Sequence, residues 1–384
     1  MASEDAGLAP PPPGRSARAR RRALFTPRVR LARWEYVGEG SYGIVFRVPG
    51  GGPGEPPRIR KVFVNSHCQV RRNRQWEAEA AALRRAAALA DRRGRPLFPR
   101  LIDVGCDRLV GEGCEPVVAP FIEMEDGGVP AAVRLAARGP GQGDAAAALL
   151  RCAKGLLAAV AALHETGLWH FDLSAMNLLV PEDGRALLAD LGGAGFGPDD
   201  VAAMQADAGS YWAWPPEMNL EPPRADRLSP LELLRAAYAR YGPSGVPWDE
   251  EGPPPSPAAL DTAREVLRGD FPGFARKVDA FMAGATIVHM CAIWLEAEGE
   301  DLAAPLREGA PPASGSPDVE AVRSCLAWAA PLLRASASLR PTPAEVLAAW
   351  GRADAAAAAG APSEPAAGPP EAPSEPPPKA RRAA

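Results

Sequence analysis

Lysine, asparagine and histidine are scarce in this chain of 384 residues, with four of each, although 43 residues are Lys or Arg. Ala, Arg, Gly and Pro are abundant, as a GC-rich gene would dictate, so the rare residue types are the informative ones. The net charge of −4 is close to neutral for this length. It argues against a chain devoted to nucleic-acid binding, and we expect no specific nucleic-acid site.

Cysteine is also rare, and the six Cys form no C-x-x-C pair. This spacing argues against a zinc site and against a disulfide framework, so we expect the reduced thiols of an intracellular protein. The first thirty residues contain no apolar run, and no signal peptide is predicted. The most apolar stretch, residues 281–295, is too short to cross a bilayer. We interpret it as a buried helix and expect no membrane span.

Both ends of the chain have compositions that do not support a packed core. Residues 1–30 are rich in Pro and Arg, and eight Arg up to residue 33 are opposed only by Glu4 and Asp5. This basic arm is either a contact for import machinery or anionic surfaces, or a solvated tail without a role. Residues 353–384, dominated by Ala, Pro, Ser and Glu, are predicted to be a disordered tail.

Between these ends the sequence predicts strands first and helices later. Residues 34–64 have the short apolar segments and Gly/Pro turns of strands and hairpins. Residues 71–90 and 144–165 instead favour helices, the latter with apolar residues at helical spacing. This order predicts an α+β fold with a β-rich lobe at about 31–124 and a helical lobe at about 125–352.

The first motif that points to chemistry is a glycine-rich stretch near the start of the β-rich lobe. It comprises Val37, Gly38, Glu39, Gly40, Ser41, Tyr42, Gly43, Ile44 and Val45. Three glycines at G-x-G-x-x-G spacing let a backbone hairpin approach phosphates without Cβ clashes. A strand rather than a helix follows, which favours an ATP-covering hairpin over a dinucleotide site. A glycine-rich hairpin without a ligand is the alternative.

A lysine and a glutamate follow at spacings that suit nucleotide binding. Lys61 is predicted on the strand after the hairpin, where its ammonium group can reach the α- and β-phosphates of ATP. Glu79, on the next predicted helix, is the favoured partner of Lys61 because Leu83 follows at i+4 on the inward face. Glu77 stays open as the alternative partner. The alternative is that Lys61 does not bind phosphate and is an ordinary surface residue of an edge strand.

The strongest segment runs from His170 to Asn177 and fits H-x-D-L-x-x-x-N, the catalytic loop of protein kinases. In that pattern Asp172 accepts the proton of the attacking hydroxyl or orients it, and Asn177 holds a magnesium ion. Asp190 follows an apolar strand and precedes Gly192, as the second magnesium ligand does. The alternative is a structural His beside an unrelated Asp, which leaves the rest of the match unexplained.

Four later residues fit the same pattern through their order and spacing. Ser210 and Glu217 resemble the end of an activation segment, in which the hydroxyl contacts the catalytic Asp. Asp279 resembles the acid of a central buried helix that braces the catalytic loop. Arg340 resembles the late arginine that pairs with the glutamate at position 217.

Taken together, these motifs make residues 34–352 resemble a eukaryotic-type serine/threonine protein kinase with its bilobal fold. Phe171 in place of the usual Arg, Ser174 in place of the usual Lys, and an insertion at 218–276 narrow the resemblance. The chain is similar to the conserved herpesviral protein kinase of alphaherpesviruses. This resemblance implies ATP and Mg²⁺ as cofactors and viral and host proteins as substrates. It also implies a location in the host nucleus and the virion tegument.

Other functions remain open at this point. A kinase-fold scaffold would lack a catalytic residue, whereas Lys61, Glu79, Asp172, Asn177 and Asp190 are all present. A small-molecule, nucleoside-type phosphotransferase shares the H-x-D loop but would lack the elements around positions 217 and 340. A tegument interaction protein would use the two ends of the chain and the insertion, whose role the sequence leaves open.

Overall fold

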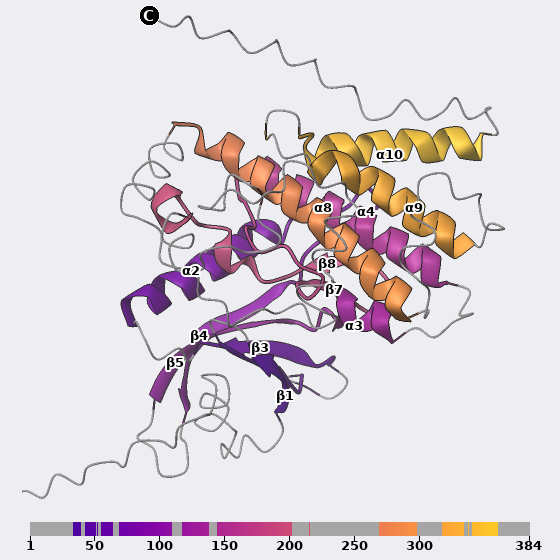
Figure 1. Cartoon of the computed structure of the whole chain (residues 1–384). Coiled ribbons are helices and arrows are strands. Elements are labelled where there is room, and N and C mark those ends of the chain that lie inside the picture. The colour runs from indigo at the N-terminus through magenta and orange to yellow at the C-terminus, as the bar shows by residue number, and fades with distance from the viewer. Residues whose placement is uncertain are drawn as a thin grey trace, which may run out of the picture. The chain divides into compact units, whose positions relative to one another are not determined.

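The architecture is mixed α+β, as the order of the sequence patterns predicts, with antiparallel strands and several helices (Figure 1). The computed structural model describes residues 34–39, 43–50, 52, 55–63, 69–109, 117–137, 144–201, 215, 269–297, 317–333, 337 and 340–359. Contacts divide the chain into two compact units. One comprises Met1–Asn73 and Ile102–Met124, and the other comprises Arg74–Leu101 and Glu125–Ala384. Residues 74–101, which the sequence analysis assigned to the β-rich lobe, therefore group with the second unit.

The first unit is built on a five-stranded sheet with the order β1-β2-β3-β5-β4. Its strands are β1 (Glu35–Glu39), β2 (Ile44–Val48), β3 (Arg58–Val62), β4 (Leu101–Leu109) and β5 (Val117–Glu125). The first three are the strands predicted within residues 34–64, and each pairs antiparallel with the next. The register between β1 and β2 shifts between Tyr36 and Gly38, so the pairing of these two strands carries an irregularity at this point.

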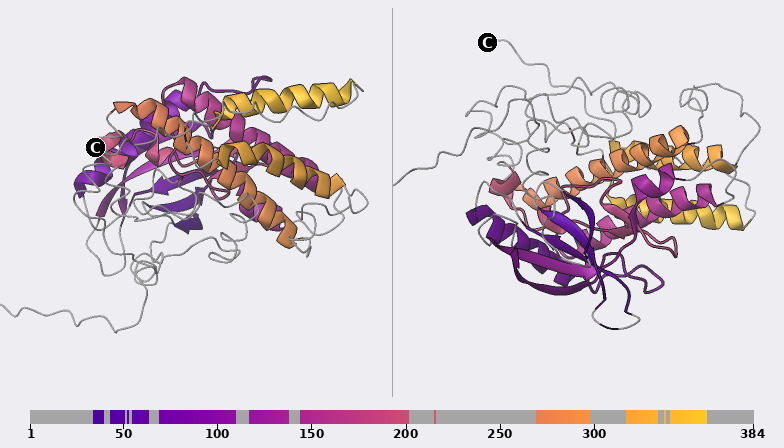
Figure 2. Two further views of the ribbon diagram at one scale, coloured as in Figure 1. Left: turned by 45° about the horizontal axis from the view of Figure 1, so that its top comes forward. Right: turned by 90° about the horizontal axis from the view of Figure 1, so that it is seen from below.

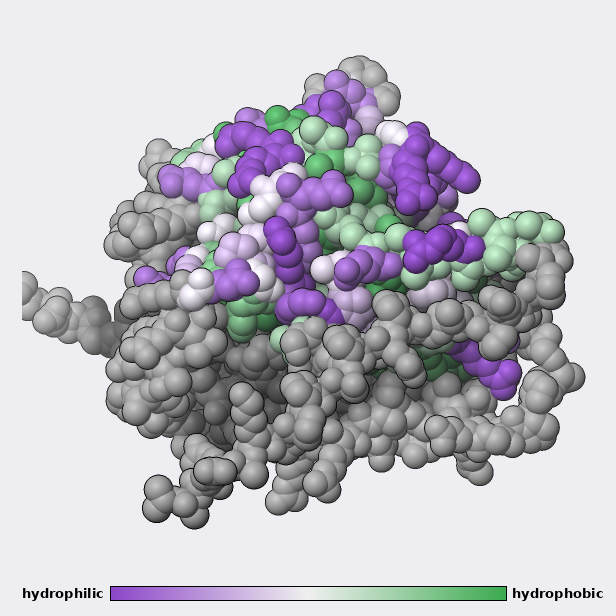
Figure 3. Space-filling view, turned by 90° about the horizontal axis from the view of Figure 1, so that it is seen from above, coloured by the Kyte–Doolittle hydropathy of each residue, from purple (hydrophilic) through white to green (hydrophobic). Residues whose placement is uncertain are grey.

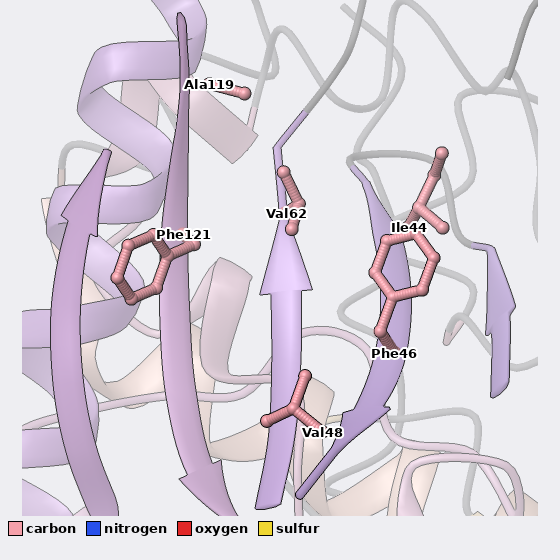
Figure 4. Packing of buried hydrophobic residues seen from close by; sticks show 6 residues of the cluster. All are labelled: Ile44, Phe46, Val48, Val62, Ala119 and Phe121. Atoms are coloured by element: carbon pink, nitrogen blue, oxygen red, sulfur yellow. The ribbon is translucent and has the colours of Figure 1, made fainter. Parts of the chain in front are cut away.

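Alternate residues of β2 are buried, and they form the centre of this unit's core. The cluster consists of Ile44, Phe46, Val48, Val62, Ala119 and Phe121 (Figure 4). Because successive strand residues point to opposite faces, these side chains define one face of the sheet. Lys61 precedes Val62 and pairs across the sheet with Val45, so these two residues lie on the opposite face.

A buried carboxylate fastens β3 to β5. Glu123 is 4% exposed and accepts hydrogen bonds from Arg58 Nη1 at 2.9 Å and from Arg60 Nε at 2.8 Å. The guanidinium of Arg60 also lies 4.8 Å from the ring centroid of Trp34 and 4.1 Å from that of Phe121. The two arginines thus compensate for the cost of burying the Glu123 charge, while the aromatic rings cover Arg60.

The second unit combines helices with a small three-stranded sheet of order β6-β7-β8. Its elements are α2 (Gln69–Ala86, from residue 74 on), β6 (Val129–Pro130), α3 (Ala131–Ala136), α4 (Ala145–Glu165), β7 (Leu178–Val180), β8 (Leu187–Leu188), η1 (Leu191–Gly193), α8 (Phe271–Ala297), α9 (Pro317–Ala329), η3 (Ala330–Leu333) and α10 (Pro343–Ala358). The helices predicted at 71–90 and 144–165 are confirmed as α2 and α4. Helix α4 packs against α8, α9 and α10, as Figures 1 and 2 show.

Helix α8 is the buried helix that the apolar stretch predicts, but it is longer than expected. It begins at Phe271 rather than near 281, so the argument that it is too short to span a membrane is wrong. By length and composition both Ala146–Glu165 and Phe271–Leu295 pass as spans, yet 94% of the apolar window in the second is buried inside the protein. That burial is typical of a core helix.

On the face shown in Figure 3, hydrophilic side chains are interspersed among hydrophobic ones.

Two predicted boundaries are corrected by the helices. Residues 271–276 were assigned to the insertion 218–276 but belong to α8, because Phe271 and Phe274 extend its apolar character and Pro272 is tolerated in a first turn. The predicted tail at 353–384 begins too early, because α10 continues to Ala358. Its last residues are mostly alanines, which have the highest helix propensity of all residues. Residues 218–268 and 360–384 lie outside the described residues.

Candidate active site

The predicted catalytic loop lies between α4 and β7, and a carboxylate from α8 holds its backbone. Asp279 is completely buried and accepts the backbone N–H groups of His170 at 2.7 Å and Phe171 at 2.9 Å. The ring Nε2 of His164, near the end of α4, lies 2.9 Å from the same carboxylate. These three contacts compensate for burying the charge and tie the loop to a core helix.

His170 links the loop to the strand that precedes Asp190. Its Nδ1 accepts the backbone N–H of Asp172 at 3.2 Å, and its Nε2 lies 3.0 Å from the carbonyl oxygen of Ala189. Because Nδ1 accepts, the ring proton must be on Nε2, which then donates to Ala189. His170 is completely buried, so it serves as a brace between two segments rather than as a group that meets a substrate.

Asn177 contacts the predicted base directly. Its side-chain Nδ2 donates to the backbone carbonyl of Asp172 at 2.8 Å and to the carboxylate Oδ2 of Asp172 at 3.1 Å. The backbone N–H of Asn177 donates to the carbonyl oxygen of Ser174 at 3.1 Å, which closes the turn between them. With the amide nitrogen engaged in this way, Oδ1 is the atom of Asn177 that suits a cation.

The β7–β8 hairpin brings Asp190 next to Asn177. Leu178 pairs with Leu188 across the hairpin, and the backbone N–H of Ala189 donates to the carbonyl oxygen of Asn177 at 2.8 Å. Asp190 follows immediately, so residues well separated in the sequence meet at the end of one small sheet. This pairing brings together the two predicted magnesium ligands.

The backbone is strained at two places beside the predicted base and ligand. Phe171 and Asp190 both have a φ of 60°, and they are the non-glycine residues with positive φ in the described part of the chain. Such conformations cost about 1–3 kcal/mol each and persist when surrounding contacts hold them. At Phe171 the hydrogen bond to Asp279 and a ring contact with Phe271, at 6.0 Å between centroids, provide that hold.

Two glycines after Asp190 allow close packing around it. A Cβ atom on Gly193 would lie 2.6 Å from the carbonyl oxygen of His170, so only glycine fits there. A Cβ on Gly192 would lie 3.3 Å from Oδ1 of Asp190 and 3.6 Å from Oε2 of Glu79. The carboxylates of Glu79 and Asp190 therefore both lie close to Gly192. Glu79 is 1% exposed, whereas Glu77 on the same helix is exposed.

The residues present fit a magnesium ion that is shared with phosphates. The described residues contain no group of three or more His, Cys, Asp or Glu that could hold a metal by themselves. Mg²⁺ in phosphoryl-transfer sites needs only one or two protein oxygens, because phosphates and water complete its coordination. Oδ1 of Asn177 and the carboxylate of Asp190 are oxygens of the kind Mg²⁺ prefers.

Apart from Glu79, the predicted nucleotide-binding residues belong to the first unit. Val37, Gly38 and Glu39 lie in β1, Gly43 precedes Ile44 and Val45 in β2, and Gly40, Ser41 and Tyr42 lie outside the described residues. A Cβ on Gly43 would lie 2.4 Å from the carbonyl oxygen of Val62, whereas a Cβ on Gly38 would meet nothing within 4 Å. Lys61 is 8% exposed, and its Nζ lies 5.3 Å from the ring centroid of Phe63.

Arg340 is buried at the start of the segment that leads into α10. Its Nη1 donates to the carbonyl oxygen of Lys277 at 2.6 Å, and Lys277 Nζ donates to the carbonyl oxygen of Arg340. The guanidinium also lies 5.0 Å from the ring centroid of Phe281. Burial lowers the pKa of Lys277. Ser210 and Glu217, the two predicted residues of the activation segment, lie outside the described residues.

Sequence reasoning missed His164 and the packing partner of Phe171. His164 is one of four His in the chain and precedes His170 by only six positions, so its rarity was a usable signal. Phe271 had no comparable signal, because it is separated from Phe171 by a hundred residues and forms part of a segment assigned to the insertion.

No protein-family model matches the chain, and no curated protein matches it. The chemistry of the site therefore rests on its own groups. The Asp172 carboxylate accepts a hydrogen bond from Asn177, and Asp190 directly follows Ala189, whose backbone N–H donates to Asn177. The buried Asp279 fixes the backbone at Phe171, directly before Asp172.

Proposed function

We propose that this protein is a serine/threonine protein kinase, which transfers the γ-phosphate of ATP to Ser or Thr hydroxyls of other proteins. The network that joins Asp172, Asn177 and the Asp190 segment carries this proposal, because phosphoryl transfer needs a proton acceptor and magnesium ligands and the side chains of these residues suit those tasks. The bilobal kinase fold is part of the proposal. The five-stranded antiparallel sheet and the helical second unit support it.

Each residue of the site has a distinct task in this mechanism. Asp172 accepts the proton of the substrate hydroxyl, or orients that hydroxyl, while the Asn177 amide holds the Asp172 carboxylate in place. Oδ1 of Asn177 and the carboxylate of Asp190 would hold Mg²⁺, which when bound would neutralise the charge of the phosphates. Catalysis then comes mainly from positioning and from electrostatic stabilisation.

Lys61 is assigned to the α- and β-phosphates, on the family resemblance. The same resemblance assigns a glutamate of α2 to orient Lys61, and the buried Glu79 suits that role better than the exposed Glu77. The position of Glu79 near Asp190 and Gly192 further supports this choice. The glycine-rich hairpin, with the steric requirement for glycine at Gly43, would cover the phosphates.

The resemblance adds further parts to the proposal. Glu217 would pair with the buried Arg340, and Ser210 would contact Asp172 as in kinases that prefer Ser and Thr. Viral and host proteins as substrates, and a location in the host nucleus and virion tegument, follow from the similarity to the herpesviral kinase.

The test is to incubate purified protein with γ-labelled ATP, Mg²⁺, a Ser/Thr peptide mixture and a nucleoside mixture, and then to identify the labelled product. We expect phosphoserine and phosphothreonine. Labelled nucleoside monophosphate without labelled peptide would assign the chain to the small-molecule phosphotransferases instead. Binding of ATP without transfer to any acceptor would favour the scaffold function.

A further inference from the structure

Two large hydrophobic side chains of the second unit are exposed, and both lie close to the proposed active site. Met176 is 55% exposed and Val133 is 49% exposed, while the unit's other large hydrophobic residues in the described part are at least partly buried. Scattered exposed hydrophobic residues are ordinary on protein surfaces. These two are informative because of what connects them, and because no step of the proposed mechanism uses either.

One backbone hydrogen bond joins the segments that carry the two side chains. The N–H of Ala132, in the first turn of α3, donates to the carbonyl oxygen of Ala175 in the catalytic loop at 3.1 Å. Val133 and Met176 are the next residues along each segment. The bond therefore fixes α3 against the loop at the point where both apolar side chains meet solvent.

Met176 is also adjacent to the reacting groups. It precedes Asn177, whose amide contacts the carboxylate of Asp172 at 3.1 Å. Consecutive Cα atoms of a peptide are 3.8 Å apart. A substrate that brings its hydroxyl to Asp172 must therefore place the neighbouring residues beside this part of the loop.

The loop offers those neighbouring residues no second charge. Asp172 is the one charged residue between His170 and Asn177. Ser174, which stands in place of the usual Lys, is neutral. An acid at these positions would attract a basic substrate side chain, whereas Met and Val gain from burying an apolar one.

We infer that Val133 and Met176 form an apolar platform that binds an uncharged, apolar side chain next to the acceptor Ser or Thr of a protein substrate. This inference rests on the proposed kinase function and names a determinant of its specificity. The platform is continuous with the proposed catalytic loop, which is why a substrate peptide, rather than another partner, is its occupant.

The test compares matched peptides that carry either Leu or Arg at each position flanking one Ser. At one of these positions, wild-type protein should have a kcat/KM about tenfold higher for the Leu peptide than for the Arg peptide. A tenfold difference is of the size expected for a small apolar contact. Met176→Glu and Val133→Glu should each lower that ratio about tenfold, so that the two peptides have about equal kcat/KM. Met176→Leu should keep the wild-type preference.

Ala356→Glu is the matched control, because it adds the same charge at an exposed position of α10. It should leave the Leu/Arg ratio unchanged. Wild-type transfer to both peptides with equal kcat/KM, or a ratio that Met176→Glu leaves unchanged, would overturn the platform while the kinase function stands. Absence of transfer to any peptide by wild-type protein would overturn both. Thermal unfolding of each variant checks that the exposed substitutions leave the fold intact.

Discussion

The backbone N–H of His170 donates a hydrogen bond of 2.7 Å to the Asp279 carboxylate, across 109 positions of sequence. The same carboxylate accepts the N–H of Phe171, and none of it is exposed. The geometry of the loop that carries Asp172 therefore depends on a charge buried in a different helix. Loss of that charge should damage the loop and the stability of the second unit together.

We expect Asp279→Ala to lower the free energy of unfolding by about 3–5 kcal/mol, because it leaves buried donors without an acceptor. Phosphate transfer should fall as well. Chemical denaturation followed by circular dichroism measures the first effect. Asp354→Ala, which removes a more exposed ion pair with Lys154, is the control and should cost under about 1 kcal/mol. Equal losses for the two variants would contradict the anchoring role of Asp279.

Gly193→Ala should reduce both stability and activity, because the new Cβ would lie 2.6 Å from the carbonyl oxygen of His170. Forcing the segments apart should cost about 1–3 kcal/mol. Gly195→Ala is the comparison, since its Cβ would lie at an ordinary 3.4 Å from Cβ of Ala78. Denaturant midpoints and transfer rates of both variants test this. A fully active Gly193→Ala variant would show that the close approach is dispensable.

The sequence predicted much of the fold and of the site, for identifiable physical reasons. Strands β1 to β3 follow from short apolar segments and Gly/Pro turns, helix α2 from its composition, and helix α4 from apolar residues at helical spacing. None of these signals needs a distant partner. The site residues Asp172, Asn177 and Asp190 were predicted because phosphoryl-transfer chemistry fixes their spacing.

What the sequence did not predict depends on contacts between distant segments. The bonds of Glu123 to Arg58 and Arg60 span more than sixty positions, and nothing local marks them. The end of α10 was missed for a different reason. Its alanines were grouped with the Pro-rich tail by composition, although alanine without proline favours a helix.

Glu79→Gln should weaken phosphate transfer, and Glu77→Gln should not. Glu79 is buried near Asp190 and Gly192, whereas Glu77 is exposed on the same helix. Because both substitutions remove one negative charge from α2, they form a matched pair. We expect kcat/KM for ATP to fall by about tenfold or more for Glu79→Gln, since loss of a charged hydrogen-bonding partner costs roughly 1.5–3 kcal/mol. A larger effect for Glu77→Gln would reverse the assignment.

The first unit should lose stability in acid through Glu123. Burial acts to raise the pKa of Glu123, but hydrogen bonds from Arg58 and Arg60 and their charges outweigh it, so the pKa lies below its ordinary value. A carboxylate with a lowered folded-state pKa contributes stability above its unfolded pKa, and that contribution is lost as pH falls through the folded-state value.

The measurement for this prediction is the free energy of unfolding between pH 7 and pH 3. Wild-type protein should lose more stability over this range than Glu123→Gln, because the variant has no carboxyl group to protonate. Glu125→Gln removes a more exposed carboxylate from the same strand and should preserve the wild-type slope more closely. Identical slopes for wild type and Glu123→Gln would exclude Glu123 as a source of acid sensitivity.

The most direct test of the central claim is the rate of γ-phosphate transfer from Mg²⁺-ATP to a Ser/Thr peptide by purified Asp172→Asn and Lys61→Met variants. We expect kcat to fall by about 10²–10⁴ in each, or roughly 3–5 kcal/mol of barrier. Asp183→Asn, which changes an exposed aspartate in the turn between β7 and β8, should keep the wild-type rate. Wild-type turnover in the Asp172→Asn variant would contradict the account.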